Sequence, residues 1–212
     1  MVLFCIMASA GKVQCTSSRL GWPPRVPLMP LQEKAHLMTA SEITRTLVHL
    51  AHGIIEKTED LQSLALVGIR RRGVPLAERL AKKIQQISSA QIPVGTLDIQ
   101  LYRDDLSTVD SKPIVHPSQI SFSVTGKDII LVDDVLYTGR TTRAALDALF
   151  DHGRPRRVRL CVLIDRGHRE LPLEASFVGK RVATTRTESI EVKLREIDEV
   201  EKVLLLETAS SE

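Results

Sequence analysis

The stretch DIILVDDVLYTGRTT (residues 128–142) combines a strand pattern, an acid pair and a turn that leads into an alanine-rich helical pattern. Its apolar run, Ile129–Val132, is typical of a parallel strand that is buried on both faces. Asp133 and Asp134 end this run, and the hydroxyl-rich turn of 138–142 follows shortly afterwards. Ligands of open α/β sheets bind beyond the carboxyl ends of the strands. The stretch therefore predicts both an α/β fold and the place of a ligand site.

The turn of 138–142 has the features of a phosphate-binding site. A turn that opens a helix presents unpaired backbone N–H groups and the positive end of the helix dipole. Gly139 lets an anion approach the backbone closely, and the threonine hydroxyls add further donors. The neighbouring carboxylates of Asp133 and Asp134 suit a sugar diol, a metal ion, or both. The sequence therefore predicts a phosphate site beside an acidic one.

The composition favours one α/β domain with a sizeable core. The chain has 212 residues, of which 43% are hydrophobic and 26% are charged, enough for one such domain and too few for two. The formal net charge of +3 permits an anionic ligand or an RNA partner without demanding either. Cys5, Cys15 and Cys161 contain no CxxC spacing, which favours neither a disulfide framework nor a zinc site and indicates a reducing cytoplasm. No apolar run approaches the roughly 20 residues of a membrane-spanning helix.

Residues 1–36 are expected to lie outside the folded domain, which we place at 37–212. The first thirty residues contain four prolines and no helical or strand periodicity. We interpret the segment as a disordered tail or as the product of a start codon placed too far upstream, with Met29 and Met38 as later candidates. A targeting peptide is the alternative, although no basic segment precedes the short apolar run of 2–8.

Beyond this tail, strand and helix patterns alternate. The expected elements, in order, are a helix from Thr39 or Ser41 to Lys57, a strand at 64–69, a helix from about Pro75, a strand at 94–102, the strand and helix of the 128–142 stretch, a strand at 158–164, and two β-rich segments at 190–194 and 203–206. Such alternation predicts a central, mostly parallel sheet that is flanked by helices. The spacing of Ile190, Val192 and Leu194 favours a half-exposed antiparallel strand.

Three further segments follow strands and are therefore expected at the same edge of the sheet. Residues 70–72 are three consecutive arginines before Gly73, which indicates a second anion site; the alternative is a surface loop with incidental arginines. The long segment of 103–119 lacks periodicity and is interpreted either as an active-site flap or as disorder. The charged cluster of 165–170 follows the strand of 158–164.

Several other kinds of site share an acid-ended strand but do not fit. The magnesium-binding strand of nucleotide hydrolases is similar, yet the chain has no GxxxxGK[ST] phosphate loop. In the receiver domain of response regulators such a strand opens the domain, whereas here most of the domain precedes it. The chain also has no GxGxxG turn, HExxH helix or GxSxG elbow.

The acid pair followed at once by Thr-Gly-x-Thr-Thr resembles the phosphoribosyl-pyrophosphate (PRPP) motif of type I phosphoribosyltransferases. The strings Val67–Gly73, Leu97–Leu106 and Asp165–Pro172, together with the opening stretch, are similar to the PyrR family, over about residues 37–206 in uninterrupted order. Members of that family are uracil phosphoribosyltransferases, and in many bacteria they also regulate pyrimidine genes by binding nascent mRNA. The resemblance implies the type I phosphoribosyltransferase fold with a small hood.

The resemblance also implies site roles. Asp133 and Asp134 would be catalytic through the ribose hydroxyls, with Mg²⁺ shared between them and the donor pyrophosphate, and Arg103 would be the third catalytic residue. The implied substrate-binding residues are Arg71, Arg72, Asp104, Asp105, Val132, Val135, Leu136, Tyr137, Thr138, Gly139, Arg140, Thr141, Thr142, Asp165, Arg166 and Val178. The implied ligands are PRPP, uracil and UMP, in a cytoplasmic homo-oligomer of two or more copies that does not bind membranes.

RNA binding is the part of the resemblance that the residues support unevenly. His52, Lys57, His168 and Arg169 match the RNA-binding surface of the regulatory members, and pyrimidine-operon leader mRNA would be the partner. Val48 and His49 replace a Thr-Arg pair, however, and Glu174 replaces a basic residue, which weakens contacts with phosphates. The arginines at 156, 157 and 159 offer partial compensation. The alternative function is an RNA-binding attenuator with weak or vestigial transferase activity.

Overall fold

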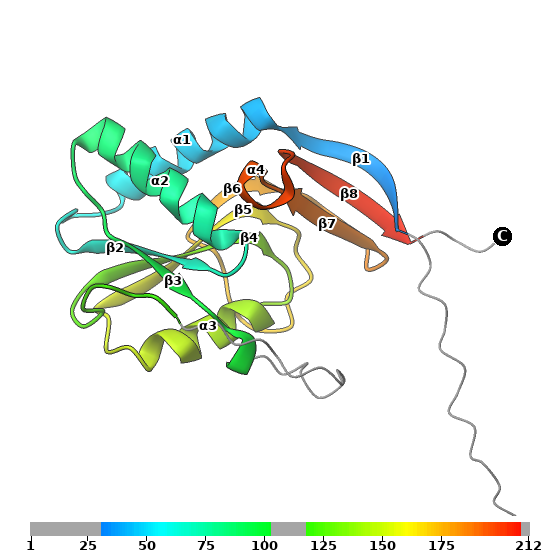
Figure 1. The fold of residues 1–212 in the computed structure, drawn as a ribbon. Coiled ribbons are helices and arrows are strands. Elements are labelled where there is room, and N and C mark those ends of the chain that lie inside the picture. Colours follow the sequence, from blue (N-terminus) through cyan, green and yellow to red (C-terminus); the bar gives the residue numbers. More distant parts are fainter. Residues whose placement is uncertain (1–30, 103–117, 209–212) are drawn as a thin grey trace, which may run out of the picture.

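The structure, a computed structural model, describes residues 31–102 and 118–208. Two sheets and the helices around them make up this part of the chain (Figure 1). The elements are β1 (Leu31–Thr39), α1 (Ala40–Glu56), β2 (Leu64–Ile69), α2 (Gly73–Ser88), β3 (Val94–Leu97), the 3₁₀ turn η1 (Gln100–Tyr102), β4 (Asp128–Leu136), α3 (Arg140–Phe150), β5 (Arg157–Asp165), β6 (Phe177–Arg181), β7 (Glu188–Lys193), α4 (Arg195–Asp198) and β8 (Lys202–Thr208).

The larger sheet is parallel throughout and has the order β3-β2-β4-β5-β6. Leu131 of β4 lies between Val67 of β2 and Leu160 of β5, so the opening stretch forms the central strand. Helices α1 and α2 cover one face of this sheet and α3 covers the other (Figure 1). The predicted α/β fold with a buried parallel strand at 129–132 is confirmed.

Helix α1 begins one residue after its cap, Thr39. The Thr39 hydroxyl accepts a hydrogen bond from the backbone N–H of Glu42 at 3.3 Å, and the Glu42 carboxylate accepts one from the Thr39 N–H at 2.8 Å. This capping box satisfies two of the N–H groups that a helix start leaves unpaired. Of the two predicted starts, Thr39 is therefore correct and Ser41 is wrong, because only Thr39 has a glutamate three residues later.

The smaller sheet is antiparallel, has the order β1-β8-β7, and forms the hood. The prediction that residues 31–36 belong to a tail is wrong, because the backbone of β1 pairs with β8 from Leu31 onward. The Lys34 ammonium also lies 2.8 Å from Glu188 and 3.1 Å from Glu207. This strand is mostly exposed, so its stability comes from backbone pairing and ion pairs that leave no apolar pattern in the sequence. The antiparallel strand predicted at 190–194 is confirmed as β7.

Strand β3 is shorter than predicted, because it ends at Leu97 and not at Tyr102. The carboxylate of Asp98 accepts a hydrogen bond from the N–H of Gln100 at 2.9 Å, and this local contact bends the chain into η1. The flap predicted at 103–119 lies mostly outside the described residues. Of its last residues, Gln119 exchanges two backbone hydrogen bonds with Thr96, each of 2.8 Å. No helix in the described ranges is long and apolar enough to cross a bilayer.

Candidate active site

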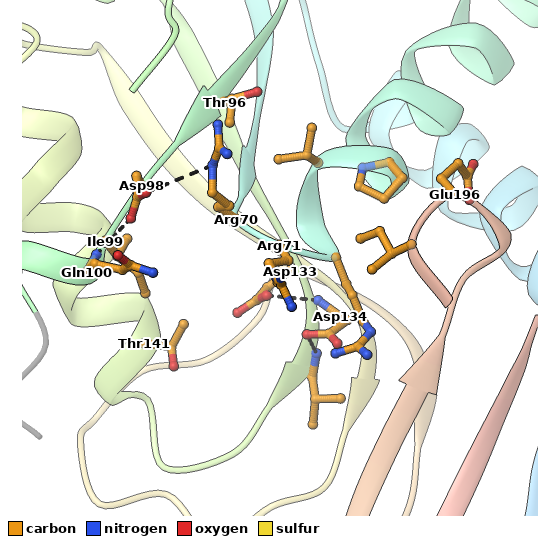
Figure 2. Close-up of a pocket in the computed structure, with 15 residues that line it drawn as sticks. Arg70, Arg71, Thr96, Asp98, Ile99, Gln100, Asp133, Asp134, Thr141 and Glu196 are labelled. Atoms are coloured by element: carbon orange, nitrogen blue, oxygen red, sulfur yellow. Dashed lines mark hydrogen bonds and ion pairs between the residues drawn. The ribbon is translucent and has the colours of Figure 1, made fainter. Parts of the chain in front are cut away.

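A cleft of about 880 Å³ lies at the carboxyl ends of the parallel strands. It takes residues from the turn after β2, from β3 and η1, from the end of β4 and from the hood (Figure 2). Its lining residues are Arg70, Arg71, Arg72, Val74, Pro75, Thr96, Asp98, Ile99, Gln100, Asp133, Asp134, Val135, Thr141, Glu196 and Ile197. The cleft thus brings the predicted acid pair and the triple arginine together.

The two aspartates at the end of β4 form the acidic part of the cleft. The side chain of Asp133 accepts a hydrogen bond from the N–H of Asp134 at 3.0 Å, and that of Asp134 accepts one from Val135 at 2.9 Å. Burial raises the pKa of Asp133 well above its usual value, and the neighbouring charge of Asp134 raises it further. Burial also raises the pKa of Asp134, although Arg72 opposes the shift. Two carboxylates that resist ionising together favour a cationic ligand between or beside them.

The acid pair fits a magnesium ion that is shared with a substrate. Mg²⁺ in phosphate-transfer sites is commonly held by one or two carboxylates, water and substrate oxygens. Asp133 and Asp134 supply two carboxylates at the cleft, and the described residues contain no cluster of three or more potential metal-ligating side chains. Their arrangement therefore fits an ion that arrives with an oxygen-rich ligand.

The turn before α3 carries the residues that are expected from the sequence to bind phosphate. Its cap residue, Gly139, has φ 93° and offers no side chain to the first N–H groups of the helix, of which that of Arg140 donates to the Thr138 hydroxyl at 3.4 Å. From behind, the carbonyl of Thr138 accepts hydrogen bonds from the N–H groups of Glu170 and Leu171 at 3.0 and 3.2 Å. These hydrogen bonds fix the turn at the start of α3, where the positive end of the helix dipole favours an anion.

The arginine turn, residues 70–72, and the following Gly73 pack closely against β4. A Cβ atom on Gly73 would lie 2.3 Å from the carbonyl oxygen of Val132, so only glycine allows this approach. The peptide bond between Arg70 and Arg71 is cis. The guanidinium of Arg72 donates two hydrogen bonds to the carboxylate of Asp198 in α4, from Nε at 3.1 Å and from Nη2 at 2.8 Å. All three arginines line the cleft, which supports the predicted anion site over the surface-loop alternative.

The loop after β5 is held together by its own arginines. Arg166 is 7% exposed, donates to the Thr184 hydroxyl at 3.2 Å and to the carbonyls of Thr185 and Glu188, and stacks 3.9 Å from the Tyr137 ring centroid. The guanidinium of Arg166, one of the predicted substrate-binding residues, is thus engaged inside the protein. Its backbone stays at the carboxyl edge of the sheet, directly after the last residue of β5.

Arg169 is also engaged within the loop. Its guanidinium donates to the carbonyls of Tyr137, Gly167 and Leu173 at 2.6, 2.9 and 3.2 Å, and to the Asp165 carboxylate. The side chain predicted to contact RNA therefore fixes the loop that borders the acid-pair strand. His168, in contrast, is exposed, although its Nε2 lies 2.6 Å from a carbonyl oxygen of the segment after β6.

The predicted RNA-binding residues do not form one cluster. His52 and Lys57 are exposed at the end of α1, which precedes the amino end of β2, whereas residues 168 and 169 follow the carboxyl end of β5. Two of the compensating arginines already have partners. Arg159 donates to the Lys57 carbonyl at 2.8 Å, and Arg156 pairs with the buried Asp128 at 2.8 Å.

Several cleft residues were not predicted from the sequence, and some predicted residues lie outside the structure. The missed residues include Asp98, Gln100, Glu196 and Ile197, and Asp198 contacts Arg72 from the hood. Asp98 directly follows β3 and is detectable as an acid at the carboxyl end of a strand, whereas the residues of α4 carry no such signal. Some predicted residues lie around β4, α3 and β6 without lining the cleft, among them Val132, Leu136, Tyr137, Thr142 and Val178. Arg140 pairs with Glu170 at 2.8 Å. Arg103, Asp104 and Asp105 lie outside the described residues.

Comparisons with known proteins agree with this geometry. A family model described as phosphoribosyl transferase domain matches residues 38–196. The chain is 56% identical over 178 residues to the Bifunctional protein PyrR of Pelotomaculum thermopropionicum, covering 84% of the chain and 98% of that relative. It is also 56% identical over 174 residues to the Bifunctional protein PyrR of Thermus thermophilus, covering 82% of the chain and 96% of that relative.

Among solved structures, the chain resembles a hypoxanthine phosphoribosyltransferase of Trypanosoma cruzi with a TM-score of 0.64 and 17% identity, covering 82% of the chain and 95% of that structure. A hypoxanthine-guanine phosphoribosyltransferase of Bacillus anthracis gives a TM-score of 0.63 and 18% identity, covering 84% and 99%. At these identities the likeness concerns the fold alone. With the sequence matches over nearly the whole length of the relatives, it shows that the chain belongs to the PyrR family of phosphoribosyltransferases.

Proposed function

We propose that the chain is a uracil phosphoribosyltransferase, which converts uracil and PRPP into UMP and pyrophosphate. In this reaction the bond between the ribose C1 and the pyrophosphate oxygen breaks, a bond from C1 to uracil N1 forms, and N1 loses its proton. One observation carries the proposal: the acid pair, the start of α3 and three arginines meet at one cleft. The identity with PyrR proteins supports uracil as the acceptor.

The cleft is suited to the charges that develop during such a transfer. Positive charge grows on the ribose ring in the oxocarbenium-like transition state, and negative charge grows on the leaving pyrophosphate. Asp133 is buried and Asp134 is half-buried, so their carboxylates would stabilise the ribose charge more strongly than they would in water. Magnesium would neutralise part of the pyrophosphate charge when it is bound with PRPP.

Each part of the donor has matching groups in the cleft or beside it. The 5′-phosphate accepts hydrogen bonds from the N–H groups and hydroxyls of 138–142, and the ribose hydroxyls donate to the acid pair. The pyrophosphate lies against the arginine turn of 70–72. Because this turn cannot move away from β4 without breaking the close packing of Gly73, its arginines are held ready for the ligand, which reduces the entropy lost on binding.

Regulation of pyrimidine genes through leader mRNA is the second function that we propose, together with assembly into a homo-oligomer in the cytoplasm. The relatives' printed name is Bifunctional protein PyrR, and one face of α1 carries the exposed side chains of Arg45, His49 and His52. Lys57 follows at the end of the helix, near Arg159. Such a face offers contacts to several successive phosphates.

The transferase test combines purified protein, uracil, PRPP and Mg²⁺, and measures the release of pyrophosphate and the formation of UMP. Stoichiometric release of both products is the expected result, whereas no turnover with uracil under any magnesium concentration would refute the proposal. For the second function, leader RNA of the pyrimidine genes and random RNA are compared in filter-binding titrations at several salt concentrations, with and without UMP. Equal affinities for the two RNAs would contradict the regulatory role.

A further inference from the structure

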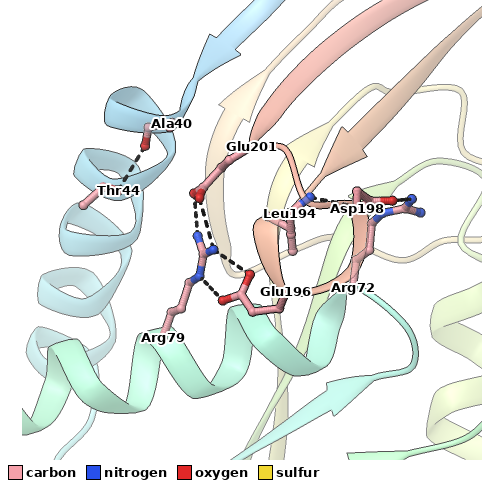
Figure 3. A network of polar contacts seen from close by, with 8 residues as sticks. All are labelled: Ala40, Thr44, Arg72, Arg79, Leu194, Glu196, Asp198 and Glu201. Atoms are coloured by element: carbon pink, nitrogen blue, oxygen red, sulfur yellow. Dashed lines mark hydrogen bonds and ion pairs between the residues drawn. The ribbon is translucent and has the colours of Figure 1, made fainter.

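The hood touches the arginine turn through one carboxylate, that of Asp198 (Figure 3). Asp198 and Arg72 are 126 residues apart in the sequence, and their side chains form a two-point contact through Nε and Nη2 of the guanidinium. Such bidentate pairs fix the orientation of the guanidinium plane as well as its position. The contact leaves Nη1 of Arg72 outside the pair, on a side chain that lines the cleft.

The Asp198 carboxylate is itself held in place. Its Oδ2 accepts a hydrogen bond from the N–H of Leu194 at 2.9 Å, and the N–H of Asp198 donates to the Leu194 carbonyl at 2.7 Å. The short turn of α4 therefore closes on itself and presents the carboxylate in one orientation. Arg72 gains a rigid partner, and its long side chain loses most of its rotamer freedom before any ligand binds.

A second pair of contacts joins α2 to the hood and does not involve Arg72. Arg79 lies about two helical turns further along α2, on the same face as Arg72. It donates to Glu196 at 2.8 and 2.7 Å and to Glu201 at 2.6 and 3.2 Å (Figure 3). The hood is thus joined to α2 at two places. Variants at the two contacts can therefore separate an effect on hood stability from an effect on the orientation of Arg72.

The acid pair offers Arg72 a second carboxylate, that of Asp134, which competes with Asp198. Arg72 and Asp134 line the same cleft, and the charge of Arg72 lowers the pKa of Asp134 against the effect of burial. Without Asp198, this second carboxylate would attract the guanidinium, and a contact there would occupy both the arginine and the acid. A carboxylate on the hood that holds Arg72 keeps both groups available for a ligand.

We propose that Asp198 is a positioning residue for the leaving group: it holds Arg72 so that the arginine meets the pyrophosphate of PRPP and stays off Asp134. This inference rests on the proposed transferase function and adds a residue of the hood to the pyrophosphate site. It also means that the hood, built from the two ends of the described chain, contributes to donor binding through Arg72.

The test compares Asp198→Asn with the wild type in steady-state kinetics and in calorimetric binding of pyrophosphate. Loss of one charge-assisted contact that orients Arg72 is expected to raise the KM for PRPP and the Kd for pyrophosphate about tenfold. The KM for uracil and kcat should change by no more than about twofold. Asp198→Glu retains the charge and should recover part of the affinity; it also replaces the first variant if that one does not fold.

Glu201→Gln is the matched control, because it removes a carboxylate from the neighbouring tie with Arg79 and leaves Arg72 unchanged. We expect it to lower the thermal midpoint but not to change the KM for PRPP. In an Arg72→Met background, Asp198→Asn should have no further effect on pyrophosphate affinity.

An unchanged KM for PRPP in Asp198→Asn, or an equal rise in Glu201→Gln, would overturn the inference, the latter because hood stability alone would then explain the effect. A wild type without turnover would refute the proposed function, and the calorimetric comparison would still decide whether Asp198 orients Arg72.

Discussion

Replacement of Asp133 by Asn should stabilise the protein while it removes activity. The Asp133 side chain is buried beside a second carboxylate, and its pKa is raised chiefly by burial and then by Asp134. An ionised Asp133 therefore costs folding free energy at neutral pH, and asparagine has nearly the same shape without the charge. The Asn Oδ1 can still accept the hydrogen bond that Asp133 accepts from the N–H of Asp134.

The expected gain is about 1 kcal/mol, in the range of single stabilising substitutions. For a chain of this length that corresponds to a rise of about 2–4 °C in the thermal midpoint. Activity, in contrast, should fall: kcat/KM should be about 100-fold lower, because a charge that stabilises the transition state is lost. Differential scanning calorimetry of the ligand-free protein measures the first effect and pyrophosphate release measures the second.

The pH dependence of the gain follows from the sign of the pKa shift. Between the unfolded pKa, about 3.9, and the raised folded pKa, the folded state holds a proton that the unfolded chain has lost. Stability of the wild type therefore falls as the pH rises through this interval, whereas the asparagine does not titrate. The advantage of Asp133→Asn should be small near pH 4 and should grow as the pH rises from 4 to 8.

Asp128→Asn is the matched control on the same strand. Asp128 is also buried, but its hydrogen bonds with Arg156 lower its pKa. Its replacement should therefore lower the thermal midpoint at neutral pH. A loss of stability in Asp133→Asn, or a gain that is equal at pH 4 and pH 8, would refute the reasoning about the acid pair.

Three further predictions concern the turn, the loop and the hood. Gly139→Ala should raise the KM for PRPP and lower stability by about 1 kcal/mol, because φ is 93° at the helix start; unchanged kinetics would contradict the turn's role. Arg166→Ala should lower the thermal midpoint by several degrees, since it leaves buried carbonyls unpaired and uncovers Tyr137; a midpoint equal to that of the wild type would contradict this. Glu188, whose pKa is about 2 chiefly through its hydrogen bond with Lys34, should stabilise the hood above about pH 4.5 and lose this effect toward pH 2. The thermal midpoints of Glu188→Gln and wild type should therefore converge toward pH 2. A difference between the midpoints that does not change with pH would contradict the role of the ionised Glu188.

The sequence predicts those parts of the fold whose signal is local. The run of 129–132 gives β4 because continuous apolar residues suit a strand covered on both faces. The pattern narrows the start of α1 to two residues, and Glu42 identifies the cap as Thr39. The arginine turn and the turn of 138–142 share the cleft because parallel strands end at one edge of the sheet.

What the sequence does not reveal depends on pairing between distant segments. Strand β1 is polar and lies against β8, so its place is decided by hydrogen bonds to residues far along the chain. The contact of Arg72 with Asp198 is likewise invisible in either local pattern. The resemblance assigns Arg169 to RNA; the contacts of its guanidinium with the carbonyls of Tyr137 and Gly167 depend on the backbone path and leave no local pattern.

The choice of uracil as acceptor is tested most directly by initial rates of pyrophosphate release from PRPP with different bases. The fold is shared with hypoxanthine phosphoribosyltransferases, so hypoxanthine is the decisive competitor at equal concentration. We predict turnover with uracil and a kcat/KM for hypoxanthine at least about 100-fold lower, since a site that hydrogen-bonds one base leaves polar groups unpaired with another. An equal or higher rate with hypoxanthine would contradict the account.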